Sequence, residues 1–383
     1  MGRVRILQTG DVHLGREFKR LENLAAERQT ELTKSFRNQI AFALNEENQI
    51  DLFLITGDLF DTYNPKPSLV GEVKGLFRRL AAGGIKIVLI PGTHDGYGYK
   101  DSVYKKYDFA PDAFVFTNQN PEPPLHLYMK GEDFFFYGFA FDPINSLDPL
   151  SHVRRIEADG IHIGIFHTSV VDRSDISIRK KDLPVSTDKL ASYRFDYAAL
   201  GHYHNYTAIT DRNDRLIAAY AGSPEATKLS ETGDRYFLVV EFENRKPRLI
   251  PHKSNIREIS HFTVDVTGSQ VLEDVFESCR GLCGDPSRIV HFELNGVPEF
   301  IIDQEQLKAM LQSQYFSVEL SDYTDIVESN FVENIAKERA TIRKLFLDEL
   351  IERLDSSRNE REREQLNLAI KIGLDEFIRN SRG

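Results

Sequence analysis

The chain has 383 residues, of which 41% are hydrophobic and 28% charged, the balance of an ordinary globular protein that is long enough for two or three domains. Its formal net charge of −11 is concentrated in residues 255–383, where 25 acidic residues outnumber 15 basic ones, and this excess argues against broad nonspecific DNA binding by that region, because phosphates repel acidic surfaces. No secretory signal opens the sequence and no apolar stretch has the length of a membrane span, so we expect a cytoplasmic protein without a membrane segment.

Short apolar runs rich in β-branched residues recur from the N-terminus to about residue 242 and predict strands. Helix-like stretches at residues 28–44 and 68–82 lie between the early runs. Strands that alternate with helices favour stacked sheets covered by helices, and polar residues at strand ends favour a site at one edge of those sheets. The predicted strands are residues 4–7, 52–55, 85–90, 134–139, 161–166, 197–200, 216–220 and 237–242.

The pattern changes near Pro247 and Pro251, and we expect a first domain of residues 1–255 to end there. Residues 256–330 are predicted to form a small α+β domain, because a helix-like stretch lies between two strand-like runs. Its predicted elements are a strand at residues 262–266, a helix at 271–278 and a strand at 289–294.

From Phe331 the pattern becomes helical and highly charged, so residues 331–383 are predicted to form a helical C-terminal region. A charged break at residues 355–364 is expected to precede a second helix at residues 366–378. Both helices have apolar faces, and they either fold back on the small domain or dock on a partner.

The two cysteines, Cys279 and Cys283, lie close together around the end of a predicted helix. Because no second pair of ligands lies nearby, we expect two reduced thiols and no zinc site. A reducing setting is the simplest interpretation of this low cysteine content.

Five polar segments stand out because each follows or ends a predicted strand. Within an extended segment, residues two apart point the same way, so Asp11 and His13 can reach one metal ion together. By the same spacing His202 and His204 can straddle a pair of ions. The carboxylate of Asp58 is the natural bridge between the ions, since an imidazole does not bridge readily. The five segments are residues 10–13, 57–61, 91–95, 166–168 and 201–204.

Aspartate and histidine ligands without thiolates suit Mn, Fe or Zn better than Ca. Two such ions about 3.5–4 Å apart would clamp a phosphate and acidify a bound water, so the segments together predict a two-metal phosphoesterase centre. His162 and His291 stand outside these segments, and we expect them to be packed or surface histidines.

The order of these segments resembles that of the calcineurin-like metallophosphoesterase superfamily. The likeness is closest to the SbcD-type DNA repair exonuclease subunit, which works with an SMC-like ABC ATPase. Two further stretches, residues 196–204 and 220–225, carry this closer likeness, and the resemblance covers roughly residues 1–255. It implies an α/β (α+β) fold, namely a four-layer αββα sandwich with a small α+β cap domain and a helical C-terminal tail.

The resemblance implies two divalent metal ions, Mn in the first place, with Fe or Zn as alternatives. It also implies that His94 binds no metal but lies over the phosphate, where it stabilises the transition state or protonates the leaving oxygen. The implied metal ligands fall into two sets that share one carboxylate. The first set is Asp11, His13, Asp58 and His204, and the second is Asp58, Thr93, His167 and His202.

Thr93 departs from the family pattern, which has Asn at this position. An Asn carbonyl oxygen is a good neutral metal ligand, whereas a Thr hydroxyl is a shorter and poorer one. The sequence therefore predicts that the second metal binds more weakly, or that a water fills the gap.

Several neighbours of the motifs have two open interpretations. Asp61 and Asp95 either orient a histidine from behind or serve turns. Because Arg16, Lys19 and Arg20 follow the first motif, they are candidates for contacts to DNA. Two further candidates are a basic stretch with Arg173 and Arg179 to Lys181, which contacts nucleic acid or forms a solvated loop, and Tyr203, which faces substrate or packs into the fold.

The leading hypothesis is a Mn-dependent DNA exonuclease or endonuclease subunit of a repair complex, with the ATPase as its partner. One alternative is a phosphoesterase for nucleotides or another small phosphodiester, since the metal chemistry is shared. A second is a non-catalytic scaffold with a degraded second metal site, which Thr93 alone favours. The resemblance also suggests a homodimer, with the helix at residues 68–82 as a candidate contributor.

Overall fold

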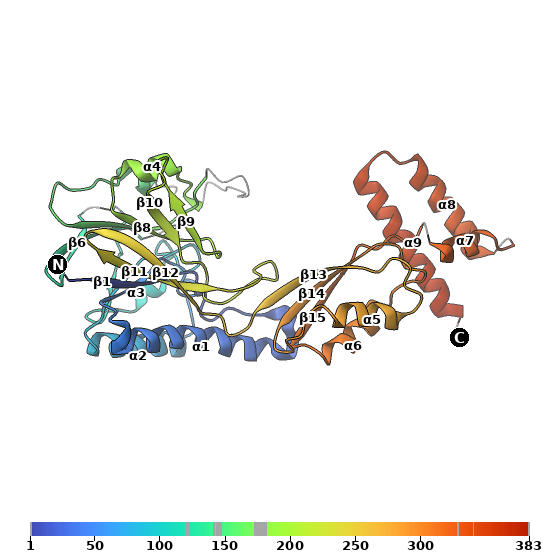
Figure 1. Cartoon of the computed structure of the whole chain (residues 1–383), viewed down its shortest axis with the longest axis horizontal. Coiled ribbons are helices and arrows are strands. Elements are labelled where there is room, and N and C mark those ends of the chain that lie inside the picture. Colours follow the sequence, from blue (N-terminus) through green and yellow to red (C-terminus); the bar gives the residue numbers. More distant parts are fainter. Residues whose placement is uncertain are drawn as a thin grey trace. The chain divides into compact units, whose positions relative to one another are not determined.

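The computed structural model describes residues 2–119, 121, 123–140, 142, 148–171, 182–327, 329–339 and 341–381. The chain divides into two compact units, Met1–Arg257 and Glu258–Gly383 (Figure 1). Within the described ranges, none of the helices has both the length and the apolar character that crossing a membrane requires.

Two mixed six-stranded sheets form the centre of the first unit. The first sheet has the order β12 (Lys246–Lys253), β11 (Tyr236–Glu243), β1 (Val4–Thr9), β2 (Leu52–Ile55), β3 (Lys86–Leu89) and β4 (Phe114–Val115). The second has the order β5 (Leu125–Met129), β6 (Glu132–Gly138), β7 (Ile161–His167), β8 (Tyr197–Gly201), β10 (Leu216–Tyr220) and β9 (Thr207–Thr210). Strands β1 to β4 are parallel, as are β6, β7, β8 and β10, so the carboxyl ends of four strands lie along one edge of each sheet.

Helices cover the outer faces of both sheets (Figure 1). They are α1 (Ala25–Leu44), α2 (Pro67–Ala82), α3 (Val103–Lys106), α4 (Thr187–Ser192) and the short η1 (Lys19–Leu24), η2 (Glu46–Asn48) and η3 (Pro149–His152). On the first sheet, Phe36 of α1 and Phe77 of α2 share one buried cluster with Phe53 of β2. On the second sheet, Leu190 of α4 shares another with Phe166 of β7.

Apolar side chains fill the space between the two sheets. Leu54 of β2 and Val88 of β3 share a buried cluster with Phe136 of β6 and Ile163 of β7. Burying one such side chain fully stabilises the fold by about 1.5–3 kcal/mol. The first unit is therefore a four-layer αββα sandwich, which confirms the predicted fold class.

The central strands are buried on both faces, which explains why they appear in the sequence as unbroken apolar runs. Helix α2 has Pro67 at its first turn, where a missing N–H breaks no helical hydrogen bond, and it ends before Gly83 and Gly84. All eight strands and both helices predicted in this part of the chain are confirmed.

A buried ion-pair network ties α1 to the end of the first unit. The guanidinium of Arg28, only 1% exposed, lies 2.9 Å from a Glu31 oxygen and 2.7 Å from a Glu225 oxygen. The guanidinium of Arg257 donates to Glu31 at 3.0 Å. Each buried charge has a partner, so removing one side chain would leave an opposite charge unpaired in the core.

The second unit combines a three-stranded parallel sheet with helices. Its elements are β13 (Ile259–Asp265), α5 (Leu272–Arg280), β14 (Ile289–Asn295), α6 (Gln304–Gln312), β15 (Ser317–Asp322), α7 (Asn330–Ala336), α8 (Ile342–Ser356) and α9 (Glu360–Ser381). Val275 of α5 and Leu307 of α6 pack with Phe292 of β14 on one face of the sheet. The Lys371 ammonium of α9 lies 3.0 Å from the Asp322 carboxylate at the end of β15, so the C-terminal helices fold back on this unit.

Both cysteines are free and lie in the core of the second unit, which confirms the expected pair of thiols. Burial raises the pKa of the Cys279 thiol to about 12. The thiolate, which is the form that binds metals or reacts, is therefore disfavoured.

Two details differ from the predicted layout. Pro247 and Pro251 lie in β12, an edge strand, where a missing N–H leaves no ladder bond unmade. The charged stretch at residues 355–364 is mostly helical, since only residues 357–359 separate α8 from α9. Glu and Arg form helices readily, and the Asn359 side chain accepts from the N–H of Arg361 at 3.1 Å.

Candidate metal centre

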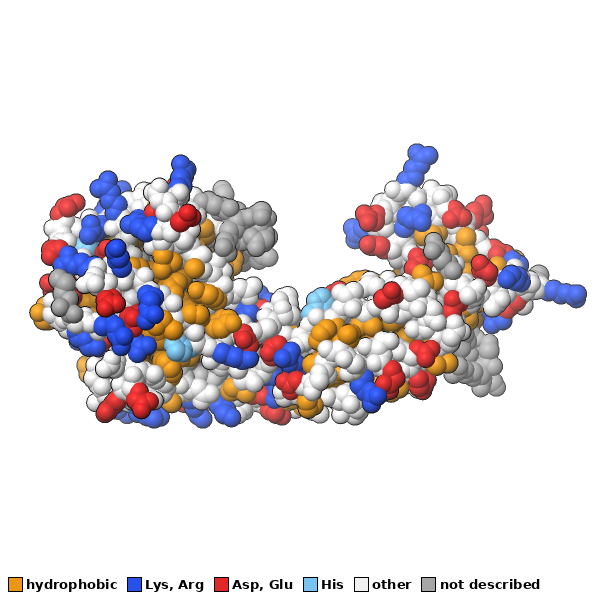
Figure 2. Space-filling view, viewed as in Figure 1, with side chains coloured by type: hydrophobic (Ala, Val, Ile, Leu, Met, Phe, Trp, Pro, Cys, Tyr) orange, Lys and Arg blue, Asp and Glu red, His pale blue; other side chains and the backbone are white. Residues whose placement is uncertain are grey.

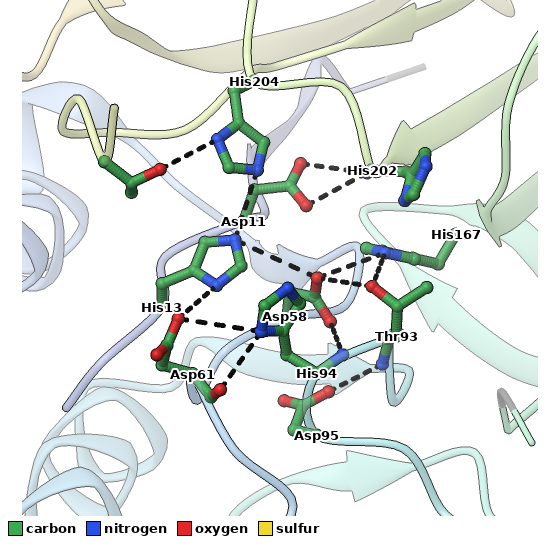
Figure 3. A network of polar contacts seen from close by, with 12 residues as sticks. Asp11, His13, Asp58, Asp61, Thr93, His94, Asp95, His167, His202 and His204 are labelled. Carbon is green, nitrogen blue, oxygen red and sulfur yellow. Dashed lines mark hydrogen bonds and ion pairs between the residues drawn. The ribbon is translucent and has the colours of Figure 1, made fainter. Parts of the chain in front are cut away.

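Five loops meet where the strands β1, β2, β3, β7 and β8 end (Figure 3). Parallel strands place their carboxyl ends at the same edge, so the fold brings all five predicted segments together. Ligand atoms of Asp11, His13 and His204 lie within 4.8 Å of one another. The same holds for Asp11, Asp58 and His167.

Several of these residues have a backbone conformation that side chains other than Gly rarely adopt. Asp11, His13, Asp58 and His202 have φ of 49°, 52°, 49° and 105°. Each such residue costs about 1–3 kcal/mol and persists only where its surroundings enforce it. Here the loops enforce each other, since the Asp11 N–H donates to the Gly57 carbonyl at 3.1 Å and the His13 N–H to the Asp58 carbonyl at 3.0 Å.

Two glycines allow the loops to approach closely. A Cβ at Gly92 would overlap the Asp58 carboxylate, and a Cβ at Gly57, which has φ of +97°, would overlap the His167 imidazole. Any larger residue at either position would displace a predicted ligand.

The Asp58 carboxylate lies at the centre of the cluster. Its Oδ1 accepts from the backbone N–H of His94 at 2.7 Å, and its Oδ2 lies 3.4 Å from His167 Nε2 and 3.9 Å from His13 Nε2. Burial alone would raise the pKa of Asp58, but the facing histidines, His167 foremost, hold it well below its usual value. Asp58 is therefore an ionised carboxylate that faces both groups of ligands, as a bridging ligand must.

Three histidines are held from behind at Nδ1, which turns Nε2 toward the cluster. A metal-binding histidine is usually held in this way, because the partner at Nδ1 fixes both tautomer and orientation. The contacts are His13 Nδ1 to Asp61 Oδ1 at 3.1 Å, His167 Nδ1 to the Thr56 carbonyl at 3.0 Å and His204 Nδ1 to Glu231 Oε1 at 2.8 Å.

The Nε2 atoms of His13 and His204 are only 3.2 Å apart. With each Nδ1 proton directed to a carboxylate, both Nε2 atoms present lone pairs toward the same point. Burial lowers the pKa of His13, which favours its neutral, ligating form. Converging nitrogen lone pairs beside the Asp11 carboxylate suit a divalent transition metal, so this donor set fits the predicted cofactor.

His167 is charged when no cation competes for it. Burial alone would lower the pKa of His167, but the Asp58 carboxylate outweighs burial and raises this pKa to about 9. A proton and a metal ion would therefore compete for His167 Nε2.

The Thr93 hydroxyl lies at a ligand position. Its oxygen is 3.0 Å from Asp58 Oδ2 and 3.4 Å from His167 Nε2, and these last two atoms are themselves 3.4 Å apart. Neighbouring ligands of an octahedral ion with bonds of about 2.1 Å are about 3.0 Å apart. The three atoms therefore have the spacing of one coordination sphere, although the Thr93 hydroxyl points its hydrogen at Asp58.

The structure does not bring the His202 imidazole into this arrangement. Its ring centroid lies 5.2 Å from that of His167, and none of the three-residue ligand groups within the described ranges includes it. Instead, its backbone N–H donates to both carboxylate oxygens of Asp11 at 3.0 Å. Burial and the neighbouring His167 lower the pKa of His202 to about 3, so the ring is neutral.

His94 lies at the accessible side of the cluster. Its side chain is 44% exposed, and its ring lies edge-on to that of His13 with centroids 4.6 Å apart. His94 Nδ1 is 3.1 Å from the backbone carbonyl of Asp61, which leaves Nε2 for an approaching substrate.

The two predicted supporting aspartates lie in different environments. Asp61 accepts from His13 and also, at 2.9 Å, from Arg16, so it orients a predicted ligand. Asp95 is fully buried and contacts no predicted ligand side chain that the structure records. It accepts from the N–H groups of Gly92 and Phe60 at 2.7 and 3.1 Å and thereby ties two of the loops together.

The candidate DNA contacts separate in the same way. Arg16 lies in the cluster through its bond to Asp61, whereas Lys19 and Arg20 are exposed on η1. The basic stretch with Arg173 and Arg179 to Lys181 lies outside the described residues. Tyr203 packs into the fold, with its ring 4.9 Å from that of Tyr220.

Sequence reasoning missed Glu231 and Thr227. Glu231 holds His204 as described, and it accepts from the Thr227 N–H at 2.6 Å. Burial alone would raise the pKa of Glu231, but His204 and Thr227 lower it to about 2. No spacing pattern links residues 204 and 231, because the turn that joins them is irregular, so the sequence carries no signal for this pair.

Residues 4–206 match the family model described as calcineurin-like phosphoesterase. Over 310 residues the chain is 26% identical to the uncharacterized metallophosphoesterase YhaO of Bacillus subtilis, which covers 78% of this chain and 73% of that protein. It is 27% identical over 279 residues to the DNA double-strand break repair protein Mre11 of Sulfurisphaera tokodaii, covering 71% and 66%. It is 25% identical over 333 residues to a subunit of the SbcCD nuclease of Staphylococcus epidermidis, covering 80% and 82%.

Proposed function

This chain belongs to the calcineurin-like phosphoesterase family, and on that premise we propose that it is a two-metal phosphodiesterase that cleaves DNA as the nuclease subunit of a repair complex. The observation that carries the proposal is the convergence of three Nε2 atoms, each held from behind, on the Asp11 and Asp58 carboxylates. The choice of DNA is supported by two of the relatives, which are named for DNA repair and for nuclease activity.

The two ions would be held by sets that share Asp58, and Mn is the proposed metal, with Fe or Zn as alternatives. When bound, the ions supply positive charge to the phosphate and lower the pKa of a water, so that it can attack phosphorus. His202 would complete the second set through a turn of its side chain toward His167. The proposed sets are Asp11, His13, Asp58 and His204 for one ion, and Asp58, Thr93, His167 and His202 for the other.

His94 is the proposed catalytic residue of the protein itself. The Asp61 carbonyl at Nδ1 fixes the ring so that Nε2 faces outward, where it can donate to a phosphate oxygen or protonate the leaving oxygen. Since Asp61 also holds His13, one residue would position a metal ligand and the general acid together. Arg16 supports Asp61 and places a positive charge at the same side.

The C-terminal helices offer a surface for the ATPase partner. Ile342 and Leu345 of α8 are 77% and 61% exposed, and Leu368 and Ile372 of α9 are 57% and 61% exposed. Figure 2 shows hydrophobic side chains reaching the surface of this unit among acidic and basic ones. Exposed apolar positions spaced by one helical turn are suited to docking on another helix.

The partner surface can be tested apart from the chemistry. Replacing Leu368 and Ile372 with Glu should abolish co-purification with the ATPase subunit and leave hydrolysis of a small phosphodiester unchanged. Co-purification of the double variant at the level of the wild type would show that this face does not dock.

The nuclease proposal is tested with end-labelled linear DNA and with a chromogenic phosphodiester, both in the presence of Mn. His94→Ala should lower the rate on DNA by roughly 10²- to 10⁴-fold, the usual contribution of general acid–base catalysis. The matched control is His126→Ala, because His126 is 53% exposed and pairs with Asp133 on neighbouring strands. Cleavage of the chromogenic ester without cleavage of DNA would favour a small phosphodiester substrate, and no cleavage of either would favour a scaffold.

A further inference from the structure

The sheet of the second unit carries polar side chains on the face opposite α5 and α6. Alternate residues such as Val264, Phe292 and Val318 point into the buried cluster beneath those helices. The residues between them point the other way, because side chains alternate along a strand. On that opposite face, His261 of β13 lies directly beside His291 of β14 in the parallel register.

These two histidines and a glutamate form a compact group. The imidazoles of His261 and His291 are stacked, with centroids 4.9 Å apart and planes 14° apart. Glu293, two residues further along β14, points to the same face, and its Oε1 lies 3.1 Å from His261 Nε2. One ligand atom from each of the three residues lies within 4.8 Å of the other two.

The surroundings favour ligation by this group. Ser321 of the adjacent β15 hydrogen-bonds His291 Nε2 at 2.8 Å and so fixes the orientation of that ring. Burial, and next His261, lower the pKa of His291, which leaves its imidazole neutral. The side chains of His261 and Glu293 are 39% and 28% exposed, so an ion can reach them from solvent. A histidine side chain is visible at the surface of this unit in Figure 2, and the unit contains only these two histidines.

We propose that His261, His291 and Glu293 form a binding site for a divalent transition-metal ion, Zn²⁺ above all. Two imidazoles and one carboxylate are a common protein set for Zn²⁺, with a water at the fourth position. Mg²⁺ and Ca²⁺ are disfavoured, since they prefer oxygen ligands. The site is separate from the candidate phosphoesterase centre, because all residues of that centre belong to the first unit.

The site is tested by counting ions on the full-length protein. Zn²⁺ binding is measured by equilibrium dialysis and elemental analysis, and Co²⁺ serves as a spectroscopic probe of nitrogen coordination. The double variant His261→Ala with His291→Ala should bind one ion fewer per chain than the wild type, and Glu293→Gln should weaken that ion by roughly tenfold or more. The matched control, His126→Ala, should bind as many ions as the wild type.

Equal ion counts in the wild type and the double variant would overturn the proposal. His261→Gln, which keeps a side chain of similar length on the exposed face, guards against misfolding as the cause of any loss. If this variant melts at the temperature of the metal-free wild type and still binds one ion fewer, the site is established independently of any effect at the phosphoesterase centre.

Discussion

Replacing Thr93 with Asn should tighten the second metal. In the structure the Thr93 hydroxyl donates its hydrogen to Asp58 Oδ2 at 3.0 Å, and the same oxygen lies 3.4 Å from His167 Nε2. To present a lone pair to an ion, this hydroxyl must give up its bond to the carboxylate. An Asn carbonyl oxygen has no hydrogen to redirect, so it can bind the ion without that loss.

The magnitude follows from the bond that is given up. A hydrogen bond to a charged group contributes about 1.5–3 kcal/mol. Because about 1.4 kcal/mol corresponds to a factor of ten in affinity, Thr93→Asn should lower the Kd of the weaker Mn ion by roughly ten- to a hundredfold. The hydrolysis rate should accordingly saturate at a lower Mn concentration.

Mn titrations followed by electron paramagnetic resonance of free Mn, together with rates on a chromogenic phosphodiester, measure both quantities. Thr93→Ser keeps the hydroxyl and should match the wild type, whereas Thr93→Val keeps the shape, loses the oxygen and should bind the second ion more weakly. The reasoning is refuted if Asn, Ser and Val variants all bind Mn with the affinity of the wild type.

Three further predictions concern residues that support the fold and the centre. Glu231→Gln should lower metal affinity by roughly 10- to 100-fold, because the carboxylate no longer holds the His204 Nδ1–H, and an unchanged Mn titration would argue against this support. Arg28→Ala should destabilise the first unit by about 3–5 kcal/mol in urea unfolding, because it leaves buried carboxylates unpaired, and a loss below about 1 kcal/mol would contradict that view. The Cys279 thiol, with its pKa raised to about 12 by burial, should resist a disulfide reagent at neutral pH until the protein is unfolded, so rapid labelling of the native chain would show that the core opens.

The sequence predicts most of the first unit because its signals are local. Strand β2 is buried along its whole length, so its residues form an uninterrupted apolar run that is visible without any tertiary information. The candidate ligands Asp11 and Asp58 follow such runs directly, and parallel strands place their ends together. The order of these segments then suffices to predict which side chains meet.

What the sequence does not predict depends on contacts between distant loops or strands. Glu231 meets His204 through an irregular turn, and His261 meets His291 only because two strands pair in a given register. The His202 imidazole lies off the cluster because its backbone has φ of 105°, which simple alternation along an extended segment does not foresee.

The central claim is that two metal ions bind around Asp58. It is tested most directly by crystals of the full-length chain grown with Mn and by anomalous X-ray scattering measured at the Mn absorption edge. The proposal predicts two anomalous peaks, one among Asp11, His13 and His204 and the other beside Asp58, Thr93 and His167. A single peak, or none in contact with Asp58, would contradict it.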